Sequence, residues 1–363
     1  MSASRSASET QEAQTLRHVE EVDPIVVMVA SDEDAAAWDQ FVTEHTGPVG
    51  YHWWAWRHVF HRAFGHEPIY LLARQGRQIV GVLPLVHIRS VISGRTLTSL
   101  PFLNYGGVVA DSNAAANSLL ELAAQVARLR RCKHIELRHV SRRFPQLPCR
   151  QHKVAMLLAL QPGMWERLDR KVRNQIRKAQ KSGLTVEDGG AELLGDFYAV
   201  FARNMRDLGT PVYSKRLFDE VLRVFPDRAH VHVVRLQGRP IAAGLSYRTR
   251  ITVEMPWASS VREFNTLCPN HLLYWSAIES AADAGCQTFD FGRSTPGEGT
   301  FRFKEQWGAQ PVPLHWEYDL MGGTSLPNLG PSNPKYHMVI ETWKRLPLAV
   351  ATRLGPHIVR AIP

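Results

Sequence analysis

The densest group of side chains able to bind negative charge follows a predicted strand over residues 287–291. The glycine-rich segment after this strand brings Arg293, Ser294, Arg302 and Lys304 close together in the sequence. Loops at strand ends often carry binding groups. Glycines there allow backbone amides to face an anion, while arginine and lysine supply charge and donors. The segment lacks the Gly-Lys-Ser/Thr sequence of a Walker loop, which excludes a P-loop ATPase. It predicts an anion-binding region, with a long turn bearing solvated cations as the alternative.

A second basic surface is predicted on a helix over residues 164–181. Its apolar positions recur every three or four residues and so form one face. Arg173, Asn174 and a large excess of lysine and arginine occupy the rest. This surface fits tRNA phosphates or a lipid-linked sugar diphosphate, and it equally fits a solvated helix face. A further helix is predicted to begin near Asn270 and His271, where free backbone N–H groups would suit a phosphate of the donor.

Two other segments are candidates for the wall of a binding site. Asn104 and Tyr105 precede two consecutive glycines, which indicates a loop where the backbone approaches a ligand closely. Trp257 follows Pro256 at the end of a predicted strand, where it is either a ligand platform or, more commonly, a core residue. The histidines and the four cysteines show no metal-ligand spacing, so neither a metal site nor a disulfide framework is expected.

An internal repeat predicts the scaffold that holds these residues. Residues 69–80 return as residues 231–242, and each copy is an apolar strand, a Gln-Gly-Arg turn and a second apolar strand. Glycine suits the positive backbone angles of a tight hairpin turn. Later in each half a helix-like stretch leads to a short strand, at residues 133–137 and 287–291. Two such similarities in the same order predict two copies of one α/β fold, with the binding site in the cleft between them.

Length and composition agree with this organisation. The 363 residues exceed what one core usually supports, and 44% hydrophobic residues suffice for two cores. No apolar stretch is long enough to cross a bilayer, and residues 1–24 form a polar, disordered tail without the layout of a secretion signal. We therefore expect a cytoplasmic protein. The net charge of +9 favours an anionic partner such as RNA, a phosphorylated cofactor or a lipid headgroup surface.

Two runs in the second half are the most specific motifs. One is Asp290-Phe291-Gly292-Arg293-Ser294 at the strand end, and the other is Phe-Lys-Glu-Gln-Trp-Gly-Ala at residues 303–309. With the paired halves, they resemble the FemAB-related proteins of the GNAT acyltransferase superfamily. The resemblance is greatest to a bacterial branch associated with exosortase (PEP-CTERM) and exopolysaccharide gene clusters. It covers nearly everything after residue 25, and further matching segments lie at residues 52–56, 64–68, 81–85, 100–107, 173–179, 333–336 and 345–348.

The resemblance implies an α/β (α+β) chain of tandem duplicated GNAT-like domains, each with a mixed central sheet flanked by helices. The first domain would span residues 25–160. The second would span residues 161–325 and include the basic helix. Residues 326–363 would form a C-terminal tail that packs on the domains or, through its basic and apolar residues, touches a membrane surface.

The resemblance also implies transfer of an acyl or aminoacyl group to an amine on a cell-envelope or exopolysaccharide precursor. Well-known members of the wider family take the aminoacyl group from tRNA and extend peptidoglycan bridges. Such a transfer needs a base for the amine, stabilisation of charge on the carbonyl oxygen and a grip on a phosphorylated donor. Glu254 is the expected base, although an ordinary strand-face glutamate would have the same pattern. Arg293 and Lys304 are expected to stabilise anionic charge.

The remaining candidate residues would bind substrate. Asn104 and Tyr105 of the first domain would line the cleft together with Arg173 and Trp257 of the second. Asp290 would anchor the glycine-rich loop that follows it. The other expected substrate contacts are Asn174, Asn270, His271, Ser294 and Arg302.

The donor is left open by one departure from the superfamily pattern. Coenzyme A binders present an Arg/Gln-x-x-Gly-x-Gly/Ala run where this chain has Glu-Phe-Asn-Thr-Leu-Cys-Pro-Asn at residues 263–270. We therefore expect no tightly bound cofactor, and either aminoacyl-tRNA or acyl-CoA as the donor substrate. Expected partners are a small-molecule or lipid-linked glycan precursor, tRNA, and the inner face of the membrane as a peripheral contact. Two alternatives stay open: an acyl-CoA-dependent N-acyltransferase that uses the same cleft, and a non-catalytic binding module for an anionic glycan or lipid-linked precursor.

Overall fold

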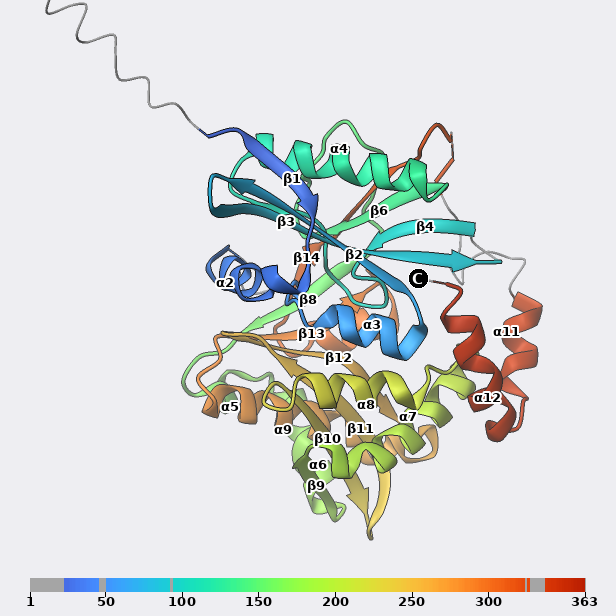
Figure 1. Cartoon of the computed structure of the whole chain (residues 1–363). Coiled ribbons are helices and arrows are strands. Elements are labelled where there is room, and N and C mark those ends of the chain that lie inside the picture. Colours follow the sequence, from blue (N-terminus) through green and yellow to red (C-terminus); the bar gives the residue numbers. More distant parts are fainter. Residues whose placement is uncertain (1–22, 46–49, 92–93, 324, 327–336, 363) are drawn as a thin grey trace, which may run out of the picture.

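Two mixed β-sheets, each flanked by helices, form the body of the protein in the computed structural model (Figure 1). The structure describes residues 23–45, 50–91, 94–323, 325–326 and 337–362. The first sheet has the strand order β1-β2-β3-β4-β6-β15-β7, with β5 paired to β3. Its strands are β1 (Ile25–Val29), β2 (Glu67–Gln75), β3 (Gln78–Ser90), β4 (Gly94–Ser99), β5 (Val109–Ala110), β6 (His134–His139), β7 (Cys149–Arg150) and β15 (His315–Asp319).

The second sheet has the strand order β14-β8-β13-β12-β11-β10-β9. Its strands are β8 (Val154–Ala159), β9 (Leu184–Gly189), β10 (Ala229–Leu236), β11 (Arg239–Arg248), β12 (Thr252–Ser260), β13 (Thr288–Ser294) and β14 (Gln310–Pro313).

The two sheets share one plan, which confirms the predicted duplication. Within the described residues each sheet is antiparallel except for one parallel pair, β4 with β6 in the first and β12 with β13 in the second. The hairpins β2–β3 and β10–β11 take equivalent places. Gly76 and Gly238 adopt positive φ angles of 58° and 79° in their turns, as the repeated Gln-Gly-Arg sequence predicts.

The halves exchange one strand each. β8 follows the first half in sequence but pairs with β13 and β14 of the second sheet. β15 follows the second half and inserts between β6 and β7 of the first sheet. Sheet membership therefore does not follow the predicted division between residues 160 and 161. The sequence repeat alone cannot reveal this exchange. The exchanged strands β8 and β15 keep their places in the repeated order of elements along the chain, although each pairs with strands of the other half.

Helices and sheets enclose three clusters of buried side chains. α4 (Asn113–Leu129) covers one face of the first sheet, and α6 (Arg170–Lys181) and α9 (Pro269–Asp283) cover one face of the second. The two halves share the third cluster, in which α3 (Trp56–Phe64) packs on α8 (Lys215–Val224). The other helices are α2 (Ala35–His45), α5 (Met164–Arg167), α7 (Leu194–Leu208), α10 (Gly299–Glu305), α11 (His337–Lys344) and α12 (Leu348–Val359).

The basic helix predicted over residues 164–181 is in fact two helices, α5 and α6. Leu168 between them is extended, with φ −63° and ψ 142°. Asp169 then caps α6 by accepting a hydrogen bond from the backbone N–H of Lys171 at 2.6 Å. Aspartate is a strong helix N-cap, so it begins a new helix here instead of continuing the first. The apolar face of α6 is buried as predicted.

The C-terminal helices α11 and α12 pack on α7. The side chain of Arg206 on α7 secures this contact, because its Nη1 donates to the carbonyl oxygen of Leu346 at 2.9 Å. Packing of the tail is thus observed for residues 337–362. The matching segment at residues 333–336 and residues 1–22 of the predicted tail at residues 1–24 lie outside the described residues. Nowhere in the described part of the chain does a helix combine the length and apolarity needed to cross a membrane.

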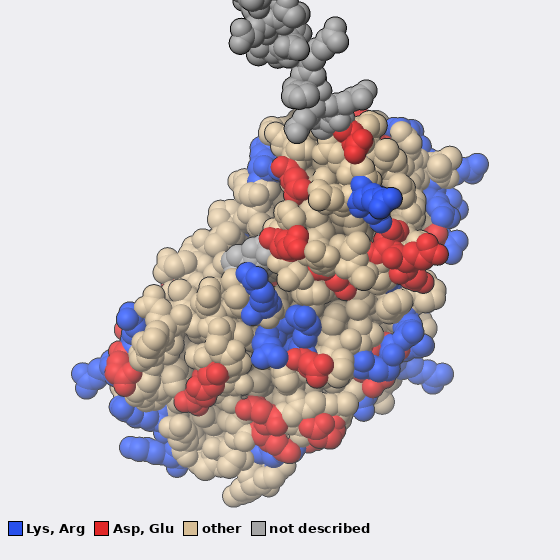
Figure 2. All heavy atoms as spheres, turned by 60° about the vertical axis from the view of Figure 1, so that its left-hand side comes forward, with Lys and Arg blue, Asp and Glu red and all other residues tan. Residues whose placement is uncertain are grey.

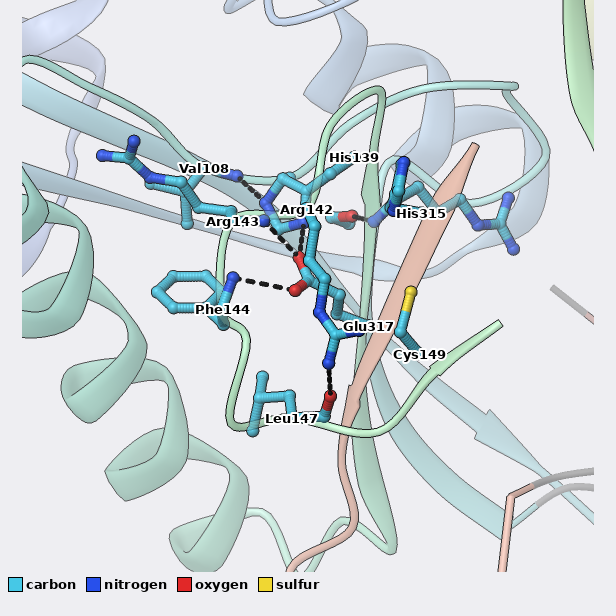
Figure 3. Close-up of polar contacts among 12 residues, drawn as sticks. Val108, His139, Arg142, Arg143, Phe144, Leu147, Cys149, His315 and Glu317 are labelled. Carbon is cyan, nitrogen blue, oxygen red and sulfur yellow. Dashed lines mark hydrogen bonds and ion pairs between the residues drawn. The ribbon is translucent and has the colours of Figure 1, made fainter. Parts of the chain in front are cut away.

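A buried polar network fastens the exchanged strand β15 to the first half (Figure 3). The carboxylate of Glu317, which solvent does not reach, accepts backbone hydrogen bonds from Arg143 at 3.1 Å and Phe144 at 2.8 Å. His139 Nδ1 lies 2.6 Å from Glu317 Oε2. The N–H of Val108 donates to His139 Nε2 at 2.9 Å, which places the imidazole proton on Nδ1, toward the carboxylate. Burial opposes ionisation of Glu317, but His139 and the two amides outweigh it and hold the pKa below its usual value.

Replacing Glu317 by glutamine is expected to lower the free energy of unfolding by about 3 kcal/mol, because buried donors lose a charged acceptor. Denaturant unfolding measures the effect. Glu187→Gln is the matched control: Glu187 pairs with Arg235 at the surface, and its loss should cost less than about 1 kcal/mol. Equal losses in the two variants would contradict the assigned role. Because the pKa of Glu317 is depressed, its contribution is present above about pH 4.3 and is lost as the pH falls further.

Candidate active site

The candidate site lies where β12 and β13 part. These strands pair in parallel only from Thr252 with Thr288 to Glu254 with Asp290, so the two acids are partners at the last paired position. Side chains alternate along a strand, and Phe289 on β13 packs in the cluster beneath α6 and α9. The acids therefore face the opposite side, toward the first half of the chain.

Asn104 and Tyr105, which follow β4 in the first half, reach across to these acids. Asn104 Nδ2 donates to Glu254 Oε1, and the Tyr105 hydroxyl donates to Asp290 Oδ2. The backbone N–H of Gly292 donates to the other oxygen, Asp290 Oδ1, at 2.7 Å. Gly292 has φ of 73°, a left-handed conformation that turns the chain back on Asp290 and that glycine adopts without strain. Asp290 is thus bonded to the backbone two residues further along its own strand, β13.

Lys304 on α10 completes the cluster. Its Nζ donates to the carbonyl oxygens of Gly292 at 3.1 Å and Arg293 at 3.0 Å. Burial lowers the pKa of Lys304 to about 8, against the opposing charges of Asp290 and Glu254. The ammonium group therefore braces the turn after β13 and supplies positive charge beside both carboxyl groups.

The two carboxyl groups titrate together. Burial raises the pKa of Glu254 well above its usual value, and the charge of Asp290 adds to the shift. Burial also raises the pKa of Asp290 to about 6, although Tyr105, the Gly292 amide and Lys304 oppose the change. Two carboxyls that share a buried site do not both ionise readily. The pair therefore holds one proton near neutral pH and is able to accept a second.

Arg293 lies beside this cluster. Its side chain is exposed, while desolvation and the nearby charge of Arg138 lower its pKa. The guanidinium carbons of Arg293 and Arg138 lie 5.5 Å and 4.4 Å from the ring centre of Trp316 on β15. Lys153, just before β8, donates to Thr295 Oγ1 at the same edge. Cations and an aromatic ring from both halves thus lie close to Arg293.

Four predicted substrate residues lie on the other face of the second sheet. Arg173 and Asn174 belong to α6, and Asn270 and His271 belong to the first turn of α9. Asn270 Nδ2 donates to Ser260 Oγ at 3.0 Å, and the His271 ring packs against the rings of Phe303 and Trp307 on and after α10. The structure does not bring these residues to the acid pair.

Three further predicted residues differ in their surroundings. Trp257 is buried, and its ring packs edge-on against Phe218 with centroids 5.3 Å apart, so it belongs to the shared core. A register shift between β11 and β12 next to this position alters which side chains face that core. Ser294 is buried at the end of β13, whereas Arg302 on α10 is exposed.

The structure adds residues that the sequence did not single out. Tyr51 is buried in contact with Glu254, whose charge helps to raise the pKa of the Tyr51 phenol after burial itself. Trp316 lies on the exchanged strand β15, and Lys153 lies just before the exchanged strand β8. Arg138 lies on β6, which is next to β15. Only Arg138 had a sequence signal, because it follows the segment that repeats as residues 287–291.

The distribution of surface charge indicates an anionic partner less clearly than the net charge of +9 does. On the face in Figure 2, basic and acidic side chains are interspersed and form no field of one sign. No group of His, Cys, Asp or Glu within the described ranges has the arrangement of a metal site.

Comparisons with known proteins agree with this architecture. Residues 167–305 match the family model for an acetyltransferase (GNAT) domain. The structure is similar to FemX, with a TM-score of 0.62 and 15% identity over 87% of this chain and 100% of FemX. It is similar to the C-terminal domain of a putative lysylphosphatidylglycerol synthetase from Agrobacterium fabrum (TM-score 0.55, 12% identity, 80% of this chain and 92% of that chain). A tandem GNAT protein from the clavulanic acid biosynthesis pathway gives a TM-score of 0.52 at 13% identity, over 83% of this chain and 99% of that chain.

No curated protein matches the chain by sequence. The similarities establish a tandem GNAT-like fold that is shared with FemX, with a GNAT domain in the second half.

Replacing Lys304 by methionine is expected to raise the pKa of Asp290 above about 6, because the carboxyl pair loses its neighbouring cation. A raised carboxyl pKa means that stability is full at low pH and is lost as the pH rises through the folded-state pKa. In the wild type the contribution of Asp290 to the free energy of unfolding is lost between about pH 4 and about pH 6. In the variant the loss should continue above pH 6, by about 1.4 kcal/mol for each unit of further increase.

Unfolding of both proteins by denaturant from pH 5 to pH 8 measures this difference. Lys181→Met, at the exposed end of α6, serves as the control and should leave the pH dependence unchanged. Parallel curves for the Lys304 variant and the wild type would show that Lys304 does not act on the pair.

Proposed function

We propose that the protein is a transferase that moves an acyl or aminoacyl group onto an amine. The observation that carries the proposal is the buried pair Glu254–Asp290 at the parting of β12 and β13, which Asn104 and Tyr105 of the other half hold in place. The GNAT domain match over residues 167–305 and the similarity to FemX support transfer chemistry of this class.

In the proposed reaction the amine nitrogen attacks the carbonyl carbon of the donor, and a C–N bond forms. The C–O bond of an aminoacyl ester, or the C–S bond of a thioester, breaks. Glu254 and Asp290, which share one proton, accept the proton that the amine loses, and the leaving oxygen or sulfur is protonated in turn. Lys304 and Arg293 offset the negative charge that develops nearby. This reading keeps Glu254 in the role of base and adds Asp290 as its partner.

The acceptor that we propose is an amine on a cell-envelope or exopolysaccharide precursor, either a small molecule or a lipid-linked glycan. The basis is the sequence resemblance to the exosortase-associated FemAB branch. An anionic group on such a precursor suits the exposed guanidinium of Arg293, near which Lys153 adds a second cation. The reaction would then take place in the cytoplasm or at the inner face of the membrane.

For the donor we favour aminoacyl-tRNA over acyl-CoA. The segment before α9 is a short 3-10 helix over Arg262–Leu267, and Pro269 at the start of α9 lacks a backbone N–H. A pyrophosphate would therefore find fewer donors there than in a glycine-rich loop. The similarity to the domain of a putative lysylphosphatidylglycerol synthetase supports an aminoacyl donor. An acyl-CoA donor is the second candidate, because the similar tandem GNAT protein is described in a form without acetyl-CoA.

Incubation with an extract of cell-envelope precursors and either charged tRNA or a set of acyl-CoA molecules tests the proposal, with product mass as the readout. One defined mass increase with either donor is expected.

Glu254→Gln and Asp290→Asn should each lower kcat/KM by about 10² to 10⁴. In the wild type kcat/KM should rise as the pH passes through about 6, where Asp290 ionises. Wild-type rates in both acid variants would remove the base assignment. Ligand binding without any turnover would favour the non-catalytic binding module.

If tRNA is the donor, its binding should weaken steeply with salt, and neutralising Arg173 and Arg177 on α6 should reduce the slope of log K against log salt by about one per residue. Filter binding across a salt series measures the slope. Arg77→Gln, in the turn between β2 and β3 of the first half, is the exposed control and should leave it unchanged. Absent or salt-insensitive binding would exclude tRNA as the donor and favour acyl-CoA.

A further inference from the structure

A cavity of about 520 Å³ lies where the end of α3, the start of α8 and the end of α12 meet. Among the described residues that line it, five have basic side chains and none has an acidic one. Each of the three helices contributes an arginine: Arg62 from α3, Arg216 from α8 and Arg360 from the end of α12. The two other basic residues are His61 and His357. The set is therefore assembled from the first half, the second half and the C-terminal tail.

These arginines are poorly neutralised by the protein itself. Across the residues that the structure describes, neither Arg216 nor Arg360 forms an ion pair with a carboxylate. The closest carboxylate of Arg62 is Glu220 at 3.7 Å, which Arg223 also engages at 2.5 Å. Cations that converge without counter-charges repel one another, and an anion bound between them would relieve that repulsion.

One neighbouring feature adds to the positive field, and a second responds to it. α8 begins here, and Ser214 at its N-cap accepts a hydrogen bond from the backbone N–H of Arg216 at 3.2 Å. The N-terminal end of a helix favours negative charge. Next to the cavity, burial lowers the pKa of His66 to about 4, and the charge of Arg360 contributes to that shift.

We propose that this cavity binds the phosphate or diphosphate group of an anionic molecule. Arginine guanidinium groups recognise phosphate oxygens in pairs of parallel hydrogen bonds, and three of them from separate elements suit a group with several oxygens. The cavity has room for more than the phosphate itself. The proposal concerns binding alone and does not depend on the transferase chemistry.

The position of the cavity relates it to the candidate active site. Phe64, in the cavity wall, stacks on Phe102 with ring centroids 4.1 Å apart, and Phe102 meets Tyr213 at 6.3 Å. Tyr213 in turn lies close enough to Arg293 for its charge to affect the Tyr213 phenol. Phe64, Phe102 and Tyr213 therefore form a chain of aromatic rings that leads from the cavity toward Arg293.

The phosphate could come from two sources. One is a soluble phosphate or diphosphate ester, for which the cavity volume leaves space. The other is the headgroup of an anionic lipid, because Val350 and Leu354 are exposed apolar residues on α12, the helix whose end lines the cavity. A membrane contact of the C-terminal region belongs to this second case.

Calorimetric titration of the full-length protein with inorganic pyrophosphate tests the proposal. The wild type is expected to bind, and the double variant Arg216→Gln/Arg360→Gln is expected to bind at least tenfold more weakly. Arg353→Gln, on α12 but outside the cavity, is the matched control and should bind like the wild type. Thermal unfolding of each variant verifies that the fold is retained, and Arg62→Gln provides a second, independent loss of charge.

Co-sedimentation with vesicles distinguishes the two sources. Binding to phosphatidylglycerol-containing vesicles but not to phosphatidylcholine vesicles, lost in the double variant, would identify a lipid headgroup. Pyrophosphate binding without vesicle binding would identify a soluble ester. The proposal is overturned if neither probe binds, or if the double variant binds as tightly as Arg353→Gln. Because every readout is binding, these results stand whether or not turnover is ever observed.

Discussion

Glu254 and Asp290 lie side by side where β12 and β13 part, and both are buried. Two carboxyl groups in such a place lose hydration and repel each other when both are ionised. The fold offsets this penalty with the amide of Asn104, the hydroxyl of Tyr105 and the ammonium of Lys304. Two of these three come from the other half of the chain. The acid pair is therefore stable only while the two halves keep their relative position.

The strand exchange secures that position. β8 pairs directly with β13, the strand that carries Asp290, and β15 pairs directly with β6 of the first half. The sheet of each half therefore contains one strand that comes from the other half of the sequence. β15 also carries Glu317, which is bonded to the first half, and Trp316, which lies over Arg293. A shift of one half against the other would break backbone ladders and this buried carboxylate network together, so the halves act as one unit.

The repeat in the sequence was sufficient to predict two related α/β halves, and the structure brings four residues that the motifs singled out close together, namely Asn104, Tyr105, Asp290 and Lys304. Which of them touch could not be predicted, because these contacts join residues on different halves and depend on how the halves dock. Trp257 was assigned to the cleft by its place at a strand end, but a register shift in the hairpin it belongs to leaves it in the core. The predicted basic helix is two helices, α5 and α6. Arg173 was expected to line the cleft, but α6 covers the opposite face of the second sheet, and sequence periodicity does not say which side of a sheet a helix covers.

The two halves also show how one ancestral position acquires different chemistry. Glu136 ends the parallel pairing of β4 with β6, as Asp290 ends that of β12 with β13. In the first half its partner is Thr98, and Glu136 is bound by Arg138 at 2.7 Å. The same arginine donates to Leu103 O at 3.0 Å and so steadies the loop that carries Asn104 and Tyr105. The first half thus neutralises its acid and becomes a support. The second half places a glutamate where the first has threonine, and that single additional carboxyl group leaves a shared proton at the site. The carboxyl pair thus belongs to the second half, and the first half holds it in place through Asn104 and Tyr105.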